Sequence, residues 1–313
     1  MPERVLLPVI AGATASGKTA CAVEVCRMLG GEVISADSMQ IFKGMEILSA
    51  APNDAERKGI AHHMIGVATP DQAFSAAIYR EHALPVIADV RSRGKQPVLC
   101  GGTGLYIDAV TRPMSFSEQG SEKIRAELHS LADEPGGREK LHKLLEDCDP
   151  ESAKRLHPND VRRVIRAIEV FRLTGETLTE QNRRDRERKG DFDERLFAVD
   201  RPRDELYQRI DARVDEMIER GLIREVRALM RLEQEQPTAI QAIGYKEIAC
   251  ALRGEMSLSE AILQMKQASR NYAKRQITWL KRDPRTVWIS ASGRTTEDVA
   301  AEICERIGET NER

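Results

Sequence analysis

A glycine-rich segment near the N-terminus has the residue types and spacing of a phosphate-binding loop. It fits the pattern G-x-x-x-x-G-K-[ST] and consists of Gly12, Ala13, Thr14, Ala15, Ser16, Gly17, Lys18 and Thr19. The two glycines let the backbone curl so that amide N–H groups face a phosphate, and the start of the following helix adds partial positive charge. Lys18 supplies a full charge and Thr19 offers its hydroxyl to Mg²⁺. The segment therefore predicts a bound phosphate compound, without saying which one.

Asp37 is the second residue with an evident chemical role. It follows the apolar segment 32–36, whereas the later apolar segment 97–100 continues into Gly101, Gly102 and Thr103 without an acid. Kinases and ATPases commonly place an acid after such a strand to organise Mg²⁺ and water. At the carboxyl end of a parallel strand, Asp37 would face the ligand and could act as a general base or bind Mg²⁺ through water. The alternative is that Asp37 only caps the next turn.

Two basic segments could follow a nucleic-acid backbone. Residues 266–285 contain seven Lys or Arg and one acid, and residues 154–172 contain six Lys or Arg and two acids, although the net charge is only −2. A solvated helix face is the competing interpretation of each segment. On the second half of the first segment, Lys274, Thr278 and Lys281 recur at helical spacing, and Arg270 extends that face by one turn.

The elements that must position these residues alternate between strands and helices. Short apolar runs predict strands at 5–11, 32–36, 96–100, 195–199 and 286–289. Helical spacing is found at 19–29, 75–93, after Gly104, at 203–220, and from a capping box at Ser257 and Glu260 to about residue 282. This alternation predicts an α/β fold, a P-loop-containing parallel sheet flanked by helices. Residues 115–194 lack strand character, so we expect an α-helical insertion domain there, with residues 1–114 and 195–313 as the P-loop core domain.

Composition places the chain among globular proteins of the cytoplasm. Hydrophobic residues make up 41% and charged residues 31%, no apolar run is long enough to span a membrane, and residues 1–8 do not resemble a signal peptide. The six cysteines form no C-x-x-C pair, and His62 with His63 lacks a third nearby metal ligand. We therefore expect reduced thiols, and a core or pocket role for the two histidines.

Several motifs along the chain together resemble the tRNA dimethylallyltransferases, also called tRNA isopentenyltransferases. Besides the phosphate loop, they are the segments 37–40 (Asp-Ser-Met-Gln), 101–106 (Gly-Gly-Thr-Gly-Leu-Tyr), 157–160 (His-Pro-Asn-Asp) with Arg163 and Arg166, 244–245 (Gly-Tyr) and 272–279 (Tyr-Ala-Lys-Arg-Gln-Ile-Thr-Trp). The resemblance covers residues 9 to about 282. It implies transfer of a dimethylallyl group from dimethylallyl diphosphate to the exocyclic amine of the adenosine on the 3′ side of the anticodon in tRNA.

The resemblance also implies roles for individual residues. The phosphate loop would hold the diphosphate with Mg²⁺, Asp37 would take the proton from the amine, and the Thr103 hydroxyl would help to position the base. The family's tRNA-contacting segments correspond to Asp37, Ser38, Met39, Gln40, Arg125, Arg162, Arg163, Val164, Ile165, Arg166, Gln241, Gly244, Tyr245, Lys246, Lys274, Arg275, Gln276, Thr278, Trp279 and Lys281. The expected partners are the tRNA anticodon stem-loop and dimethylallyl diphosphate, with no membrane contact and a monomeric protein.

The chain departs from the family pattern at a few positions. Leu48 replaces a usual glycine, Ala51 a usual lysine, Phe42 a tyrosine and Gly66 an aspartate, and no cluster of Cys and His matches the zinc finger of eukaryotic members. Contacts around the diphosphate therefore need not match those of the family. The alternatives to a transferase are a P-loop small-molecule kinase and a nucleic-acid-dependent ATPase. Trp279 and Tyr106 could stack on bases or pack internally.

Overall fold

The structure is a computed structural model that describes residues 4–116, 120–188, 190–232 and 235–309. It divides into two compact units. The core unit comprises Met1–Thr111 and Phe192–Arg313, and the helical unit comprises Arg112–Asp191. None of the helices within the described ranges has the length and apolar character needed to cross a membrane.

The core unit is built on a six-stranded sheet in which all neighbouring strands are parallel, with the order β3-β2-β4-β1-β5-β6. The strands are β1 (Val5–Gly12), β2 (Gly31–Ser35), β3 (His62–His63), β4 (Gln96–Gly101), β5 (Phe192–Asp200) and β6 (Val287–Ser290). Each strand is separated from the next by helical or loop crossovers, which parallel pairing requires. The expected α/β fold with a parallel sheet is confirmed.

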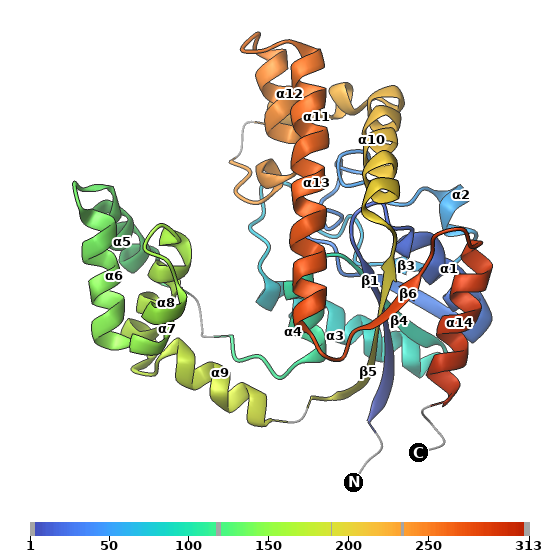
Figure 1. Ribbon diagram of the computed structural model, residues 1–313, viewed down its shortest axis with the longest axis horizontal. Helices are drawn as coiled ribbons and strands as arrows, with labels where there is room; N and C mark the ends of the chain where they lie inside the picture. The colour runs from blue at the N-terminus through green and yellow to red at the C-terminus, as the bar shows by residue number, and fades with distance from the viewer. Residues whose placement is uncertain (1–3, 117–119, 189, 233–234, 310–313) are drawn as a thin grey trace. The chain divides into compact units, whose positions relative to one another are not determined.

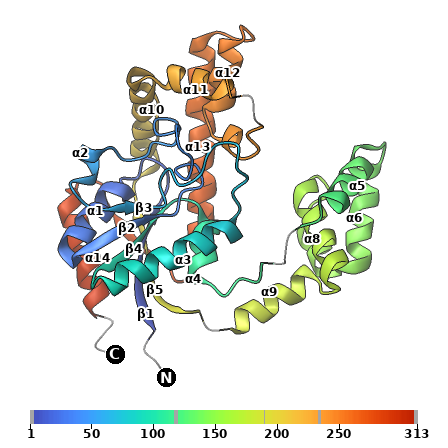
Figure 2. The same cartoon turned by 180° about the vertical axis from the view of Figure 1, so that it is seen from behind.

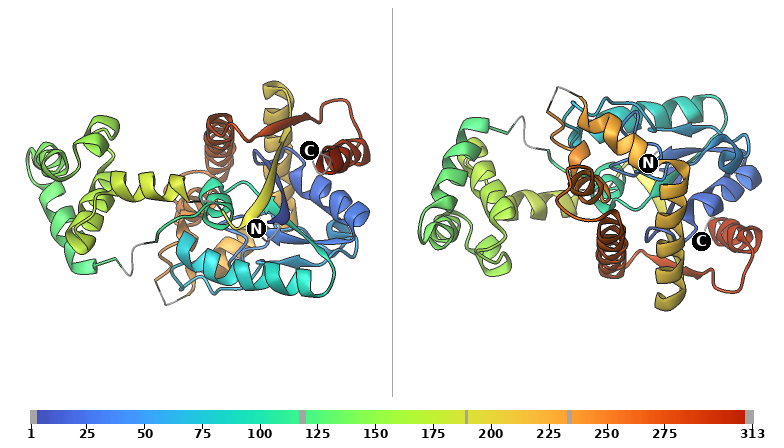
Figure 3. Two further views of the ribbon diagram at one scale, coloured as in Figure 1. Left: turned by 90° about the horizontal axis from the view of Figure 1, so that it is seen from below. Right: turned by 90° about the horizontal axis from the view of Figure 1, so that it is seen from above.

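One face of the sheet is covered by α1 (Lys18–Leu29) and α14 (Thr296–Glu309), which lie together along the strands in Figure 3. Their apolar residues meet those of the strands in one cluster that includes Ile10, Val25, Val199 and Ile303. The cysteines Cys21, Cys26 and Cys100 are buried here with free thiols, as expected. Burial raises the pKa of Cys100 to about 12, so this thiol stays protonated.

The other face carries α3 (Ala76–Ser92) and α4 (Gly104–Thr111), visible from behind in Figure 2. Tyr79 of α3 stacks on Tyr106 of α4 with ring centroids 4.2 Å apart, and Tyr106 is only 3% exposed. Tyr106 is therefore a packing residue, which decides between the two roles considered for it.

Beyond the sheet edge stand α10 (Arg203–Arg220) and α13 (Leu258–Arg282), side by side in Figure 1 and joined by an ion pair between Lys266 and Asp215 at 2.7 Å. The expected capping box of Ser257 and Glu260 begins α13. Shorter elements complete the unit: α2 (Asp54–Arg57), α11 (Leu222–Met230), the 3₁₀ turn Ala239–Gln241 and α12 (Tyr245–Leu252).

The helical unit contains α5 (Glu122–Asp133), α6 (Gly137–Cys148), α7 (Pro150–Arg155), α8 (Val161–Thr174) and α9 (Leu178–Glu187). Its own core is formed by Leu128, Leu141, Leu145, Val164 and Ile168, all at most 2% exposed. Residues 112–116, 120–188 and 190–191, the part of this unit that the structure describes, include no strand.

Candidate active site

The phosphate loop connects β1 to α1, and Lys18 is the first residue of that helix. Gly17 has φ 98°, a left-handed conformation that suits glycine because it lacks a Cβ. The Lys18 ammonium donates to the carbonyl of Ala13 at 3.2 Å, and the residue is 9% exposed. Burial lowers the pKa of Lys18, and so does the like charge of Arg213, while Asp37 opposes both effects. A negatively charged ligand would therefore stabilise this ammonium.

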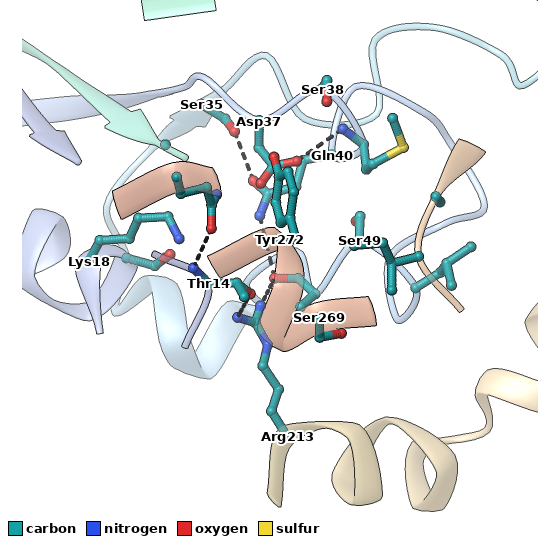
Figure 4. Close-up of a pocket in the computed structure, with 18 of the residues that line it drawn as sticks. Thr14, Lys18, Ser35, Asp37, Ser38, Gln40, Ser49, Arg213, Ser269 and Tyr272 are labelled. Carbon is teal, nitrogen blue, oxygen red and sulfur yellow. Dashed lines mark hydrogen bonds between the residues drawn. The ribbon is translucent and has the colours of Figure 1, made fainter. Parts of the chain in front are cut away.

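Three arginines hold the loop from outside: Arg201 comes just before α10, and Arg209 and Arg213 lie within it. Arg201 Nε donates to the Ser16 carbonyl at 2.8 Å, and Arg209 Nε donates to the Ala15 carbonyl at 2.9 Å. Arg213 Nη1 donates to Thr14 Oγ1 at 3.2 Å, as Figure 4 shows. A carbonyl and the next residue's N–H point in opposite directions across a planar peptide, so the Gly17 N–H faces away from Arg201.

The local sequence pattern does not reveal these arginines. Arg209 and Arg213 look like part of an ordinary charged helix face, and Arg201 lies just before that helix. Nothing in the local pattern links the three to a loop that lies 185 to 199 residues earlier. Arg213 also lines the same cavity as Lys18. Burial lowers the pKa of Arg213, and the charge of Asp37 counteracts this shift. Arg213 is thus a second cation beside the phosphate loop.

Gln276 of α13 completes the loop from inside the protein. Its Oε1 accepts the Thr14 N–H at 2.7 Å, and its Nε2 donates to the Gly102 carbonyl at 2.9 Å. A Cβ on Gly102 would lie 2.1 Å from this Nε2, which explains why a glycine is needed there. The resemblance placed Gln276 in a tRNA-contacting segment, but its side chain is buried and satisfies two backbone groups.

Asp37 lies just beyond the carboxyl end of β2 and lines the cavity together with Lys18 and Thr19. Its Oδ1 accepts the Met39 N–H at 2.9 Å, so the carboxylate does cap the following turn. The rest of the carboxylate faces the cavity, where it interacts electrostatically with Lys18 and Arg213. Both interpretations offered by the sequence are therefore compatible in one side chain.

Thr103 lies directly beside the Asp37 turn. The Thr103 N–H donates to the Ala36 carbonyl at 3.2 Å, and Thr103 Oγ1 accepts the Ser38 N–H at 3.0 Å. A Cβ on Gly101 would lie 2.1 Å from the Ala36 carbonyl oxygen. A glycine at this position therefore allows the end of β4 to lie close to the backbone of Ala36. The turns after β2 and β4 are thereby fixed to each other.

Several of these residues line one cavity of about 200 Å³, whereas Thr103, Arg201 and Arg209 do not. Its polar side is formed by Thr14, Lys18, Thr19, Asp37, Ser38 and Gln40, and its apolar side by Leu48, Ile210, Val214, Met217 and Met265. Tyr272 also lines the cavity, and burial together with the charge of Asp37 raises its pKa to about 12. The phenol is therefore a neutral hydrogen-bond donor near pH 7. The cavity can hold an anionic group at one end and an apolar group at the other.

Some further residues suggested by the family motifs line this cavity, and others do not. Met39, Gln241 and Arg275 also line it. Gly244 caps the start of α12, and its N–H donates to Glu247 Oε2 at 2.9 Å. Tyr245 and Lys246 are the first two residues of that helix.

The outer face of α13 matches the expected face in part. Lys274, Thr278 and Lys281 are exposed, as their spacing suggested. Arg270 instead pairs with Asp211 of α10, so it does not extend that face. Trp279 packs against Gly104, and its Nε1 donates to Asp108 Oδ2 at 3.3 Å, which favours the packing role considered for it.

In the helical unit, two of the suggested arginines share one buried acid. Arg125 Nε lies 2.7 Å and Arg166 Nη1 2.9 Å from opposite oxygens of Glu169, whose side chain is fully buried. Arg163 pairs with Asp160 at 3.2 Å, and Arg162 is exposed. The side chains of Val164 and Ile165 are at most 3% exposed within the core of the unit, so they offer no surface to a ligand.

His62 has the pocket role expected for it, whereas His63 is partly exposed and pairs with an acid. His62 lines the cavity, while His63 Nε2 lies 2.7 Å from Glu32 Oε2. Among the residues with described positions, no group of three or more His, Cys, Asp or Glu side chains could hold a metal ion. A metal at this site would need oxygen ligands from elsewhere, such as a bound phosphate.

Comparisons with known proteins place this site in a family. Residues 40–283 match the IPP transferase family. A tRNA dimethylallyltransferase of Carboxydothermus hydrogenoformans is 40% identical over 99% of each chain. The crystal structure of a tRNA delta(2)-isopentenylpyrophosphate transferase from Staphylococcus epidermidis has 38% identity and a TM-score of 0.72, covering 98% of this chain and 100% of its own. A eukaryotic dimethylallyltransferase acting on tRNA has 28% identity and a TM-score of 0.83, covering 98% of this chain and 79% of its own.

Proposed function

Because the chain belongs to the IPP transferase family, we propose that it transfers a dimethylallyl group from dimethylallyl diphosphate to an adenosine of tRNA. The acceptor is the exocyclic amine of the adenosine on the 3′ side of the anticodon. One observation carries this proposal: Lys18, Arg213 and Asp37 surround a single cavity that also has an apolar side. A prenyl diphosphate has the matching combination of charge and hydrocarbon.

The diphosphate binds at the phosphate loop. Lys18 and Arg213 supply two positive charges, and the loop supplies backbone N–H donors at the start of α1. As the allylic carbon–oxygen bond breaks, negative charge grows on the departing diphosphate. Because the donors are fixed by Arg201, Arg209 and Gln276, they do not need to reorganise when that charge develops.

Mg²⁺ fits this site as a cofactor. Thr19 and Asp37 bring a hydroxyl and a carboxylate oxygen to the cavity that would hold the diphosphate, and hard oxygen ligands are those Mg²⁺ prefers. When bound, the ion would supply further positive charge to the diphosphate oxygens. Thr19 is the residue we assign to it.

Asp37 acts as the general base. The amine of adenine is a weak nucleophile because its lone pair is delocalised into the ring, so it must lose a proton as the new carbon–nitrogen bond forms. Asp37 accepts this proton, the amine nitrogen bonds to the allylic carbon, and diphosphate leaves with the electrons of the broken bond. The Thr103 hydroxyl, next to Ser38, helps to position the base.

The tRNA contacts come from both units. A base stacked in the anticodon loop must be turned out before it can enter a cavity of this kind. The exposed cations Lys274, Lys281 and Arg162 are suited to salt-sensitive phosphate contacts. We assign the core unit to catalysis and the helical unit to holding the anticodon stem-loop, in a monomeric enzyme of the cytoplasm.

The direct test is to incubate the protein with unmodified tRNA, Mg²⁺ and labelled dimethylallyl diphosphate, and then to identify the labelled nucleoside. We expect label on adenosine next to the anticodon and release of one diphosphate per transfer. A parallel incubation with ATP and tRNA should yield no ADP. ATP hydrolysis without labelled nucleoside would overturn the proposal in favour of an ATPase.

A further inference from the structure

The loop Met45–Pro52 forms part of the cavity wall, through Leu48, Ser49, Ala50 and Pro52. Much of this loop is held by its own hydrogen bonds, since the N–H groups of Ser49, Ala50 and Ala51 donate to carbonyls within the loop at 2.9 Å. The N–H groups of Ile47 and Leu48 instead donate to an acceptor outside the loop. This acceptor is an acid on a helix far along the chain.

That acid is Glu225 of α11. Its Oε2 accepts the Ile47 N–H at 2.9 Å and its Oε1 accepts the Leu48 N–H at 2.7 Å. Two successive backbone N–H groups bound by both oxygens of one carboxylate hold the loop in position and orientation. Glu225 does not itself line the cavity, so any effect on the ligand must pass through the loop.

The loop leads directly to the diphosphate site. Ala50, two residues after Leu48, has φ 48°, an uncommon conformation for a residue with a Cβ. Its carbonyl accepts Arg213 Nη2 at 3.2 Å and Gln40 Nε2 at 3.4 Å. The same Arg213 donates to Thr14 of the phosphate loop. The position of the Ala50 carbonyl therefore helps to set where the Arg213 guanidinium lies.

Burying the Glu225 carboxylate costs free energy, because the charged group loses contact with water. Desolvation raises its pKa, although the two N–H donors oppose this shift. Across the described ranges of the chain it takes part in no ion pair with Lys, Arg or His within 4.0 Å. An amide or an apolar side chain would avoid the cost of burying charge, but neither could accept both N–H groups.

We propose that Glu225 is a positioning residue for the diphosphate: it holds Ile47 and Leu48 so that the Ala50 carbonyl aligns Arg213 with the phosphate loop. This inference rests on the proposed function, and it assigns a role in substrate binding to an acid outside the cavity.

The test measures binding of inorganic diphosphate with Mg²⁺ by calorimetry in the full-length protein. In Glu225→Gln the side chain can accept one N–H but presents an NH₂ group to the other. We therefore expect Glu225→Gln to weaken diphosphate binding roughly tenfold, comparable to the loss of one charge-assisted hydrogen bond. The matched control is Glu219→Gln, an exposed acid on α10, which should bind as wild type. The KM for tRNA should stay within about twofold in both variants, because neither Glu225 nor Glu219 lines the cavity.

A double-mutant cycle with Arg213→Gln tests the route of the effect. If Glu225 acts through Arg213, then adding Glu225→Gln to the Arg213→Gln variant should weaken diphosphate binding by less than about twofold. Equal losses in both backgrounds would overturn the inference, and so would wild-type affinity in Glu225→Gln. If Glu225→Gln fails to fold, Glu225→Asp serves instead, because the shorter acid can reach only one of the two N–H groups.

Failure of the proposed function would look different. In that case wild-type protein would transfer no dimethylallyl group to tRNA, or Lys18→Ala would bind diphosphate as tightly as wild type. Transfer by the wild type and loss of binding in Lys18→Ala, together with unchanged binding in Glu225→Gln, would refute the role of Glu225 alone.

Discussion

The side-chain oxygen of Gln276 accepts the backbone N–H of Thr14 at 2.7 Å, across 262 positions in the sequence. The amide nitrogen of the same side chain donates to the Gly102 carbonyl at 2.9 Å. One buried side chain thus joins the phosphate loop, the turn after β4 and the long helix α13.

Replacing Gln276 by Ala should therefore affect both stability and binding. The change leaves a backbone N–H and a carbonyl without partners, which we expect to lower the free energy of unfolding by about 1–3 kcal/mol. Diphosphate affinity should fall as well, because Gln276 holds the Thr14 N–H and so helps to fix the shape of the phosphate loop. Denaturant unfolding and calorimetry measure the two effects. The neighbouring Arg275→Ala should lower the free energy of unfolding by less than about 1 kcal/mol, because Arg275 is exposed and contacts only the Tyr272 ring among the described contacts. Equal stability of the Gln276 and Arg275 variants would contradict the bridging role.

Asp37→Asn should abolish most turnover while preserving the turn. The Asn side-chain oxygen can still accept the Met39 N–H that Asp37 Oδ1 now binds, but it cannot take a proton from the amine. Loss of a general base reduces the rate by roughly a hundred- to ten-thousandfold. Single-turnover transfer assays give the rate, and calorimetry should show that affinities for diphosphate and tRNA are retained. Wild-type turnover in this variant would remove Asp37 from the chemistry.

Lys18→Ala should weaken binding of dimethylallyl diphosphate far more than binding of tRNA. Lys18 brings a full positive charge into a loop otherwise made of backbone donors, and it has no described contact with the exposed cations of α13. Separate titrations with each substrate provide the comparison. Equal losses for both substrates would indicate a folding defect or a shared site instead.

The double substitution Lys274→Ala and Lys281→Ala should weaken tRNA binding and flatten its dependence on salt. Both side chains are exposed on the outer face of α13. Each lost phosphate contact should reduce the slope of log affinity against log salt by roughly 0.7–0.9. A control with Arg91→Ala and Lys95→Ala, exposed cations in the last turn of α3 and just after it, should keep the wild-type slope. An unchanged slope in the α13 variant would exclude this face from the tRNA surface.

Acid should weaken the fold partly through Glu32. Its pKa is lowered to about 2 from an ordinary value near 4.5, first by Arg93 and then by His63, against the effect of burial. The ionised form is thus favoured in the folded state. Its stabilisation is fully present above about pH 4.5 and is lost as the pH falls toward 2.

A Glu32→Gln variant tests this expectation through denaturant unfolding at several pH values. At pH 7 it should be less stable than wild type by about 1–2 kcal/mol, a value reduced by solvent screening of partly exposed Arg93. The difference should shrink between pH 5 and pH 2. A difference that does not vary with pH would assign the cost to packing rather than to charge.

The sequence was sufficient to predict the parts of the fold that have local patterns. The phosphate loop, the strands around Val9, Ile34 and Leu99, and the capping box at Ser257 all depend on spacing within a few residues. By contrast, β3 consists of only His62 and His63 and is defined by pairing with β2, so no periodicity could reveal it. Helix α14 was also missed, although its pattern is amphipathic.

In the candidate site, too, the residues that stand in local motifs could be predicted and the others could not. Asp37, Lys18 and Thr19 stand in motifs, and the structure brings them to one cavity. Arg213 and Glu225 were missed because each acts by a hydrogen bond to a residue more than 160 positions away. Such contacts depend on how α10 and α11 pack, which residue spacing within those helices does not encode.

The central strand has a consequence for synthesis of the protein on the ribosome. β1 pairs with β5 along its whole length, from Val5 with Phe192 to Gly12 with Val199, yet β5 is translated only after the entire helical unit. One edge of β1 must therefore stay without its partner while about 180 residues are made, several seconds or more at ordinary translation rates. The helical unit has its own buried core and can fold in that interval. A nascent chain can thus complete its helical unit before its parallel sheet is complete.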